Sequence, residues 1–236
     1  MLRARSRVTG VDVGVVMLAN TLPRPPGDLG NARSYAYPVA FETCPGADTA
    51  LVVERRAAGL LGEVAAAGTR LVGLGVRAVT TCCGFLALFQ RELVERVAVP
   101  VATSSLLQVP QVLAMLPESS AVCVLTVNAA TLSDEHLAAV GITAELRKRV
   151  VLAGLEHTAH FYPMILGEHR ELDVAVAESE VVAAATAALA DHPDIGAFVF
   201  ECTNLPPYSD AVRAVTDRPV WDALTLVDWV RAGVAR

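Results

Sequence analysis

Residues 76–86 read VRAVTTCCGFL, a short β-branched run that ends in a thiol pair and is followed at once by a glycine and a helical pattern. Residues 195–208 read IGAFVFECTNLPPY, where a second apolar run ends in a cysteine and the Pro-Pro pair suits the first turn of a helix. In α/β proteins, ligands bind outside the carboxyl ends of the parallel strands. Cys83 and Cys202 are therefore predicted to face each other across one small molecule.

Strands alternate with helices along the whole chain. Apolar runs typical of strands occupy residues 11–18, 39–43, 77–81, 99–102, 121–126, 150–152, 197–201 and 219–221. Helical patterns occupy residues 48–75, 85–97, 106–116, 133–140, 172–190, 206–216 and 224–235. This alternation predicts an α/β fold of mainly parallel sheets flanked by helices, with right-handed crossovers. The two cysteine-bearing units suggest two pseudo-symmetric lobes with the active site between them.

A long loop follows the first predicted strand. Residues 20–38 are rich in proline and glycine, which break regular structure. Loops of this length in compact domains are usually functional or disordered. Because this loop leaves the carboxyl end of the first strand, we expect it to face the substrate.

The composition argues against several classes of protein. Of the 236 residues, 53% are hydrophobic, and the formal net charge of −6 argues against a nucleic-acid surface. No uncharged apolar stretch reaches the ~18 residues of a membrane span, so no membrane association is expected. A buried first strand explains the residues after the basic start better than a signal peptide, because Asp12 interrupts the apolar stretch.

The five cysteines fit neither a disulfide framework nor a zinc site, because they are odd in number and show no C-x-x-C spacing. Thiols kept reduced predict a cytoplasmic protein. Cys123 lies inside an apolar run and is predicted to be a core residue. If Cys83 faces the site, Cys82 should point into the packing behind it, because successive side chains of a strand alternate between faces. Cys44 is predicted to be a loop thiol, and no role is assigned to it.

Cys83 and Cys202 each lie where a strand gives way to a helix, a setting in which backbone N–H groups and the helix dipole lower the pKa of a thiol. Two opposed thiols suit inversion of a stereocentre beside a carboxylate, since one removes the α-proton and the other delivers a proton to the opposite face. The negative charge that develops on the carboxylate needs hydrogen-bond donors. Candidate donors at strand-to-helix edges are Thr81, Thr103, Ser104, Thr126, Thr203 and Asn204. Helix capping is the alternative role for hydroxyls in such positions.

Thr-Cys-Cys-Gly-Phe at residues 81–85 and Glu-Cys-Thr-Asn at residues 201–204 resemble the two signature motifs of the aspartate/glutamate racemase superfamily. This superfamily includes cofactor-independent aspartate, glutamate and hydantoin racemases, maleate isomerases and arylmalonate decarboxylases. The resemblance covers most of the chain and implies two pseudo-symmetric lobes, usually in a dimer. It also implies a first lobe of residues 1–116 with 209–236 and a second lobe of residues 117–208.

The resemblance assigns roles to individual residues. Cys83 and Cys202 match the catalytic pair, and Thr126 matches a substrate-contacting threonine. Asn20 falls near the place where amino-acid racemases of the superfamily carry a polar or acidic residue. The loop that contains Arg24 is unlike that of the glutamate racemases. Independently of the resemblance, Arg24 is a candidate anchor for the substrate carboxylate, and a solvated loop arginine is the alternative.

At two places the motifs differ from those of the glutamate racemases, and both differences bear on which substrate is bound. Gly84 and Phe85 stand where those enzymes commonly carry Asn-Thr, and Asn204 stands where they carry a histidine. All three residues are predicted to contact the substrate, and the departures argue against glutamate itself.

Other enzyme classes fit less well. A pyridoxal-phosphate enzyme needs a Schiff-base lysine, and the only lysine, Lys148, lies in a basic run that is predicted to be exposed. A cysteine hydrolase needs a histidine beside its nucleophile, and none lies near a cysteine in the sequence. His157 and His160 are spaced for one helix face, where a surface or core pair is expected more than a metal site.

The sequence therefore predicts a cofactor-independent racemase or epimerase of a small α-substituted carboxylate, such as an amino acid or a hydantoin-like compound. The partners expected are this small molecule and further copies of the chain, in a homodimer or a higher homo-oligomer. Decarboxylation of a substituted malonate and cis-trans isomerisation of a maleate-like diacid are alternatives on the same scaffold. An inactive small-molecule binding protein is a further alternative.

Overall fold

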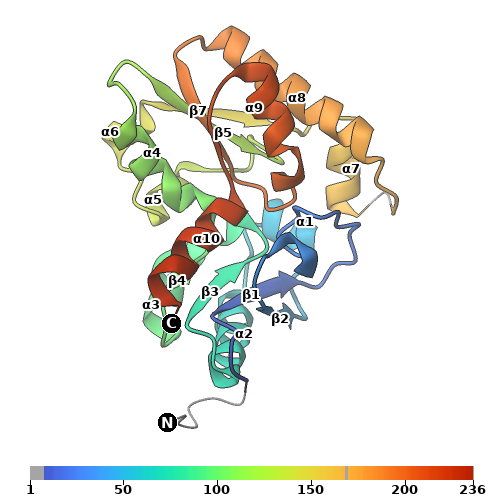
Figure 1. Ribbon diagram of the computed structural model, residues 1–236, viewed down its shortest axis with the longest axis vertical. Helices are drawn as coiled ribbons and strands as arrows, with labels where there is room; N and C mark the ends of the chain where they lie inside the picture. Colours follow the sequence, from blue (N-terminus) through green and yellow to red (C-terminus); the bar gives the residue numbers. More distant parts are fainter. Residues whose placement is uncertain (1–7, 168–169, 236) are drawn as a thin grey trace.

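The fold consists of two four-stranded parallel sheets flanked by helices, one in each of two lobes (Figure 1). The computed structural model describes residues 8–167 and 170–235. The strand order is β2-β1-β3-β4 in the first sheet and β6-β5-β7-β8 in the second, so both lobes have the same topology. The strands are β1 (Val13–Leu18), β2 (Val39–Cys44), β3 (Ala78–Thr81), β4 (Val101–Ala102), β5 (Ala121–Thr126), β6 (Val150–Gly154), β7 (Ile195–Phe200) and β8 (Val220–Trp221). This arrangement confirms the predicted α/β fold with two pseudo-symmetric lobes.

Helices connect the strands in both lobes. The α-helices are α1 (Thr49–Val53), α2 (Leu61–Leu74), α3 (Gln90–Arg96), α4 (Val109–Met115), α5 (Asp134–Ala139), α6 (Ala144–Arg147), α7 (Phe161–Leu166), α8 (Val174–Asp191), α9 (Ser209–Thr216) and α10 (Ala223–Val234). Short 3-10 segments are η1 (Ala32–Ser34), η2 (Gly84–Phe89), η3 (Ser105–Gln108) and η4 (Pro206–Tyr208). η2 begins at the residue after Cys83, and η4 begins shortly after the second cysteine motif, so both motifs lie at junctions between a strand and a helical segment.

Parallel pairing places the two cysteine motifs in equivalent positions. β3 pairs with β1 and β4, while β7 pairs with β5 and β8. β3 and β5 are buried at every residue, as expected for central strands covered on both faces. The chain runs from β1 outward to β2 and then returns to the other side of β1 as β3, and β5, β6 and β7 repeat this pattern. Such a switch in strand order opens a crevice at the carboxyl ends of the strands, and Cys83 and Cys202 lie there.

The helical pattern predicted for residues 48–75 is divided into α1 and α2. Its ends are as expected: the Asp48 side chain caps α1 by accepting from the backbone N–H of Leu51, and Gly75 ends α2 with a φ of 110°. Between the two helices, Arg56 and Ala57 have positive φ values of 57° and 53°. The chain turns there, so that α1 lies against the pocket and α2 packs on β1 and β2.

The end of the chain is shared between the lobes. β8 extends the second sheet by pairing with β7, and α9 packs against α8 of the same lobe. Among the described elements of this segment, α10 is the one that returns to the first lobe, where it contacts β3 and β4. The expected return of residues 209–236 as one unit therefore differs from the structure, because the short β8 ladder keeps the first part of this segment in the second lobe.

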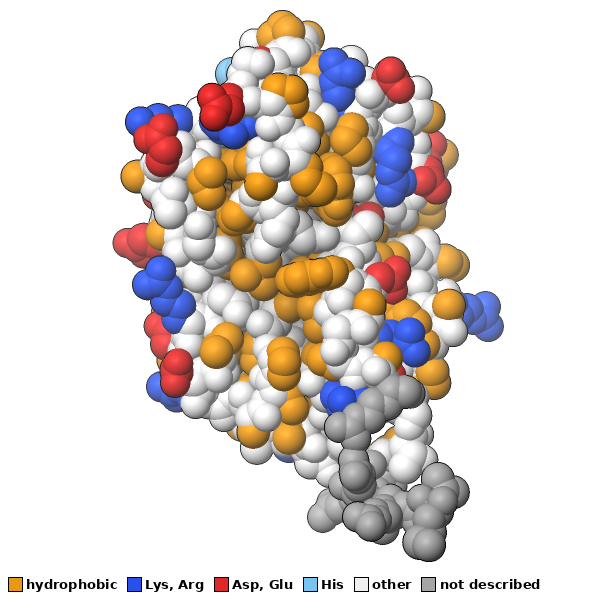
Figure 2. Space-filling view, turned by 60° about the vertical axis from the view of Figure 1, so that its left-hand side comes forward, with side chains coloured by type: hydrophobic (Ala, Val, Ile, Leu, Met, Phe, Trp, Pro, Cys, Tyr) orange, Lys and Arg blue, Asp and Glu red, His pale blue; other side chains and the backbone are white. Residues whose placement is uncertain are grey.

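One face of the molecule is notably apolar. Figure 2 looks onto the side that carries α4 and α10 and shows hydrophobic side chains gathered across its middle. Met115 of α4 and Trp229 of α10 are each 63% exposed, and both border a groove that Gln111 and Trp221 also line. Within the described parts of the chain, no helix combines the length and apolar character needed to cross a membrane.

Candidate active site

A pocket lies where the carboxyl ends of β1, β3 and β7 meet, between the two lobes. Both predicted catalytic residues, Cys83 and Cys202, are in its lining. α1 and α7 contribute apolar side chains that cover it, among them Val53 and Ile165. The volume of the pocket is about 20 Å³, which is room for about one water molecule. Binding of any ligand larger than a water molecule therefore requires the side chains that line the pocket to move.

The two thiols have matching backbone surroundings. Cys83 is partly exposed, whereas Cys202 is 6% exposed. The backbone N–H two residues further along the chain faces each sulfur, that of Phe85 at Cys83 and that of Asn204 at Cys202. The Cys202 thiol also donates to Asn204 Oδ1 at 3.7 Å. The pseudo-symmetry of the lobes thus extends to the hydrogen-bond donors beside the sulfurs.

Burial has the largest effect on the pKa of both thiols. It raises the pKa of Cys83 and of Cys202, and the nearby Glu201 carboxylate raises both further. The backbone N–H groups lower each pKa but do not offset burial. The sequence-based expectation of a lowered thiol pKa is therefore wrong for this closed pocket, because desolvation of the charged form outweighs the backbone donors.

Glu201 is a buried carboxyl between the two cysteine motifs. It has no exposed surface, and its Oε2 accepts a hydrogen bond from Thr126 Oγ at 2.7 Å. Its Oε1 is also buried and has no hydrogen-bond partner within the described structure. Gly84 packs directly on this carboxyl, and a Cβ on residue 84 would overlap it. Burial raises the pKa of Glu201 to about 7, although the Thr126 hydrogen bond lowers it.

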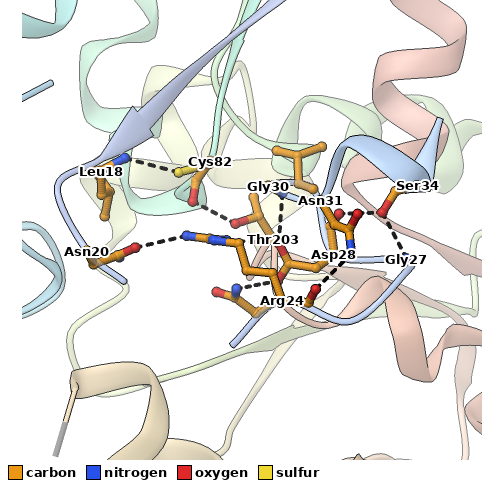
Figure 3. A network of polar contacts seen from close by, with 12 residues as sticks. Leu18, Asn20, Arg24, Gly27, Asp28, Gly30, Asn31, Ser34, Cys82 and Thr203 are labelled. Atoms are coloured by element: carbon orange, nitrogen blue, oxygen red, sulfur yellow. Dashed lines mark hydrogen bonds and ion pairs between the residues drawn. The ribbon is translucent and has the colours of Figure 1, made fainter. Parts of the chain in front are cut away.

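The loop after β1 is fastened to the second cysteine motif (Figure 3). Asp28, 1% exposed, accepts from Arg24 Nη1 at 2.8 Å and from the Gly30 N–H at 2.7 Å. Its second oxygen accepts from Asn204 Nδ2, and the Leu29 N–H donates to the Thr203 carbonyl at 3.2 Å. We call the contacts of Asp28 with Arg24 and Asn204 the loop clasp. The clasp ties a loop of the first lobe to the second lobe.

Arg24 and Cys82 meet on the loop side of the pocket. Arg24 Nη2 donates to Asn20 Oδ1 at 2.9 Å, and the guanidinium charge lowers the pKa of Cys82, although burial raises it more. Cys82 lines the pocket and accepts a hydrogen bond from the Leu18 N–H at 3.2 Å (Figure 3). Its sulfur is therefore not confined to the packing behind Cys83.

The residues predicted to bind substrate fall into two groups. Those that line the pocket are Asn20, Gly84, Phe85, Thr203 and Asn204. Those that do not are Arg24, Thr81, Thr103, Ser104 and Thr126. Substrate contact by any of them stays a prediction.

In the second group, every polar side chain has a partner in the protein. Thr81 donates to the carbonyls of Cys83 and Thr103, and the Thr103 hydroxyl bonds to Gln90. Ser104 caps η3 by accepting from the Leu106 N–H, which is the capping alternative considered for such hydroxyls. These side chains hold the edge of the first sheet together.

Asp28 and Glu201 were not singled out by the sequence reasoning. Each has a signal in the sequence: Asp28 follows Arg24 by four residues, and Glu201 is a charged residue that directly follows the apolar strand β7. His160 Nε2 accepts from the Asp173 N–H, and the described residues contain no cluster of three or more side chains that could hold a metal ion.

Curated relatives cover nearly the whole chain. A dimethylsulfoniopropionate lyase from Durusdinium sp. clade D is 30% identical over 226 residues, which is 94% of this chain and 74% of the relative. Dimethylsulfoniopropionate lyase 5 from Emiliania huxleyi (strain CCMP1516) is 32% identical over 227 residues, 93% of this chain and 45% of the relative. The chain thus spans three quarters of the first relative but less than half of the second. No protein-family model matches the chain.

Solved structures share the fold at low sequence identity. Allantoin racemase from Klebsiella pneumoniae has a TM-score of 0.60 at 17% identity, with 95% of this chain and 88% of that chain covered. Arylmalonate decarboxylase has a TM-score of 0.58 at 16% identity, with 94% and 92% covered. Aspartate and glutamate racemases also match. The chain belongs to the family of the dimethylsulfoniopropionate lyases that it matches, and it has the fold of the aspartate/glutamate racemase superfamily.

Proposed function

We propose that the protein is a lyase that removes the proton beside a substrate carboxylate with a cysteine thiolate and eliminates a group from the β-carbon, with dimethylsulfoniopropionate as the substrate. The observation that carries this proposal is that Cys83 and Cys202, from equivalent strands of the two lobes, line one pocket. The family relation to proteins named dimethylsulfoniopropionate lyases supports elimination as the reaction. No cofactor is part of the proposed chemistry.

The reaction balances with one base. The Cys83 thiolate takes the α-proton, and the electron pair of the C–H bond forms a double bond to the β-carbon. The bond from the β-carbon to the sulfonium sulfur breaks, and its electron pair leaves on sulfur. The products are acrylate, dimethyl sulfide and a proton, which the Cys83 thiol returns to solvent. Donors beside the carboxylate would stabilise the charge that develops there. Asn20 lines the pocket, and its amide has a second N–H besides the one that it donates to Thr49 Oγ, whereas the Thr203 hydroxyl donates to the Cys82 carbonyl.

The two thiols are suited to different roles. Cys83 is the more exposed of the two and is assigned the role of base. Cys202 is buried and its thiol donates to Asn204 Oδ1, so it is assigned the protonated role on the opposite side of the substrate. In an elimination, this second thiol needs only to position or polarise the substrate, because neither product requires a proton from the enzyme.

Incubation of the purified protein with dimethylsulfoniopropionate is expected to release dimethyl sulfide and acrylate in equal amounts. Dimethyl sulfide is measured in the headspace by gas chromatography, and acrylate by proton NMR of the same sample. The double variant Cys83→Ala/Cys202→Ala is the blank. If the wild-type protein releases no more dimethyl sulfide than this blank, the lyase assignment is wrong.

Racemisation is the second candidate, because two thiols that line one pocket can serve as the two bases of an inversion. In deuterium oxide, a racemase would place deuterium on the α-carbon of an α-substituted carboxylate and invert it without releasing a fragment. The same experiment detects decarboxylation of a substituted malonate by the loss of carbon dioxide. Release of dimethyl sulfide, inversion with deuterium incorporation and loss of carbon dioxide thus distinguish a lyase, a racemase and a decarboxylase.

The predicted homodimer stays a proposal, and the apolar face of α4 and α10 is the surface on which to test it. Trp229, which is 63% exposed on α10, would become buried against a second copy. Trp229→Glu is expected to convert a dimer into a monomer, as measured by light scattering coupled to size-exclusion chromatography. Val215→Glu on α9 is the control, because Val215 is 59% exposed and does not line the groove beside Trp229. An unchanged mass for Trp229→Glu would place any dimer contact elsewhere.

A further inference from the structure

The thiols of the pocket present a problem that the thiolate mechanism must solve. Burial raises the pKa of Cys82, Cys83 and Cys202, so none of them ionises readily near neutral pH by losing its proton directly to water. A thiolate near neutral pH therefore needs a proton acceptor that lies inside the pocket.

Glu201 is the carboxyl closest in place to this role, because it acts electrostatically on Cys83 from within the same pocket. Its carboxyl lines the same pocket and packs on Gly84, the residue directly after Cys83. Oε2 is occupied by the Thr126 hydroxyl, whereas Oε1 is buried and lacks a partner. A buried oxygen without a partner is costly and rarely retained without a function. Here it is the free acceptor beside the Cys83–Gly84 segment.

The surrounding groups favour Cys83 over Cys202 as the donor of the proton. The Cys202 thiol already donates to Asn204, while no described residue other than Glu201 offers Cys83 a carboxylate. The other charged groups, Arg24 and Asp28, are paired with each other in the loop clasp. Outside the lining, the buried His136 packs edge-on against Phe85 and stays neutral, because burial lowers its pKa to about 4.

We propose that Glu201 accepts the proton of the Cys83 thiol and so generates the thiolate base. The S–H bond breaks, an O–H bond forms at Oε1, and the negative charge moves from the carboxylate to sulfur, so the buried pocket gains no net charge in the step. Glu201 acts on the substrate only through Cys83 and is a positioning residue. This role rests on the proposed use of Cys83 as a base, but it does not depend on which substrate is bound.

The sign of the pH dependence follows from this scheme. Below the pKa of Glu201, near 7, the carboxyl already holds a proton and cannot take another. Above it, the pocket carries one negative charge that the thiol and the carboxyl share, and the pair titrates as a unit. The reactivity of Cys83 should therefore rise as the pH passes through about 7. In Glu201→Gln the rise should occur at the higher pKa of the isolated thiol.

The test measures alkylation of Cys83 by iodoacetamide across the pH range, with the modified residue identified by mass spectrometry and no substrate present. Glu201→Gln is expected to move the rise by more than one pH unit and to lower the rate at neutral pH more than about tenfold. Glu118→Gln is the matched control, because Glu118 is exposed and does not line the pocket. An unchanged profile in Glu201→Gln overturns the proposal.

A second variant keeps the proposal testable if Glu201→Gln does not fold. Thr126→Val removes the hydrogen bond that lowers the pKa of Glu201, so the rise should move to higher pH. Where the double variant folds, Thr126→Val should cause no further shift in the Glu201→Gln background. A Thr126→Val profile identical to wild type overturns the proposal. Lyase activity that is absent while the alkylation shift is present contradicts the proposed substrate and leaves the role of Glu201 intact.

Discussion

Cys83→Ser is expected to lower the rate of dimethyl sulfide release by about 10²–10⁴-fold, the usual contribution of a positioned general base. The serine hydroxyl fits the space of the thiol, but its proton is far less acidic, and Glu201 cannot ionise it. Steady-state rates of dimethyl sulfide release measure the effect. Circular dichroism before and after the assay confirms that the variant is folded.

Cys202→Ser separates elimination from two-base inversion. Elimination moves a proton only onto Cys83, so the serine at position 202 can still occupy the opposite side of the substrate and a smaller loss is expected. Racemisation needs a proton from each side in turn, and both single variants would then lose inversion equally. Cys44→Ala should retain activity, because Cys44 does not line the pocket. A Cys83→Ser variant with the wild-type rate would remove this residue from the mechanism.

The cysteine pair could be predicted because its signal is local and repeated. An apolar strand, a cysteine and a helical turn recur at β3 and β7, and parallel α/β topology brings the carboxyl ends of such strands to one crevice. Apolar runs located the described strands, most clearly the central strands β3 and β5, which are buried at every residue. The division of the helical pattern at residues 48–75 was missed: Arg56 and Ala57 are not residues that favour positive φ, and Gly59, which also has a positive φ, was the one signal of a turn there.

The chemical state of the site could not be predicted, because it depends on contacts across the sequence. Glu201 accepts a hydrogen bond from Thr126, which lies 75 residues earlier in the chain. Its other carboxyl oxygen is buried against Gly84 and has no partner, which the sequence does not indicate. The sequence places Cys83 and Cys202 where backbone N–H groups can stabilise a thiolate, and the structure confirms those donors. The sequence gives no measure of the burial that raises the pKa of each thiol by more than these donors lower it. Burial is a tertiary quantity, so the direction of these pKa shifts required the structure.

Asp28→Asn is expected to destabilise the protein by about 3–5 kcal/mol, the cost of leaving a buried charge without its partner. The Arg24 and Asp28 side chains are 12% and 1% exposed, so solvent cannot replace the lost carboxylate. The new amide also presents a donor where Asn204 Nδ2 donates, which breaks the second contact of the loop clasp. Urea unfolding measures the change. Glu145→Gln is the control, because the Lys148–Glu145 pair is 70% and 81% exposed and its loss should cost no more than about 1 kcal/mol.

The double variant Arg24→Met/Asp28→Asn shows whether the unpaired charge causes this loss. If it does, removal of the guanidinium should recover part of the stability lost in Asp28→Asn, because no buried charge then remains without a partner. Activity should not recover with stability, since the loop would still lack its contact with Asn204 beside Cys202. A double variant less stable than Asp28→Asn alone would mean that Arg24 stabilises the loop through Asn20 rather than through Asp28. Recovery of stability without activity would identify the loop clasp as the part of the first lobe that holds the second cysteine motif in place.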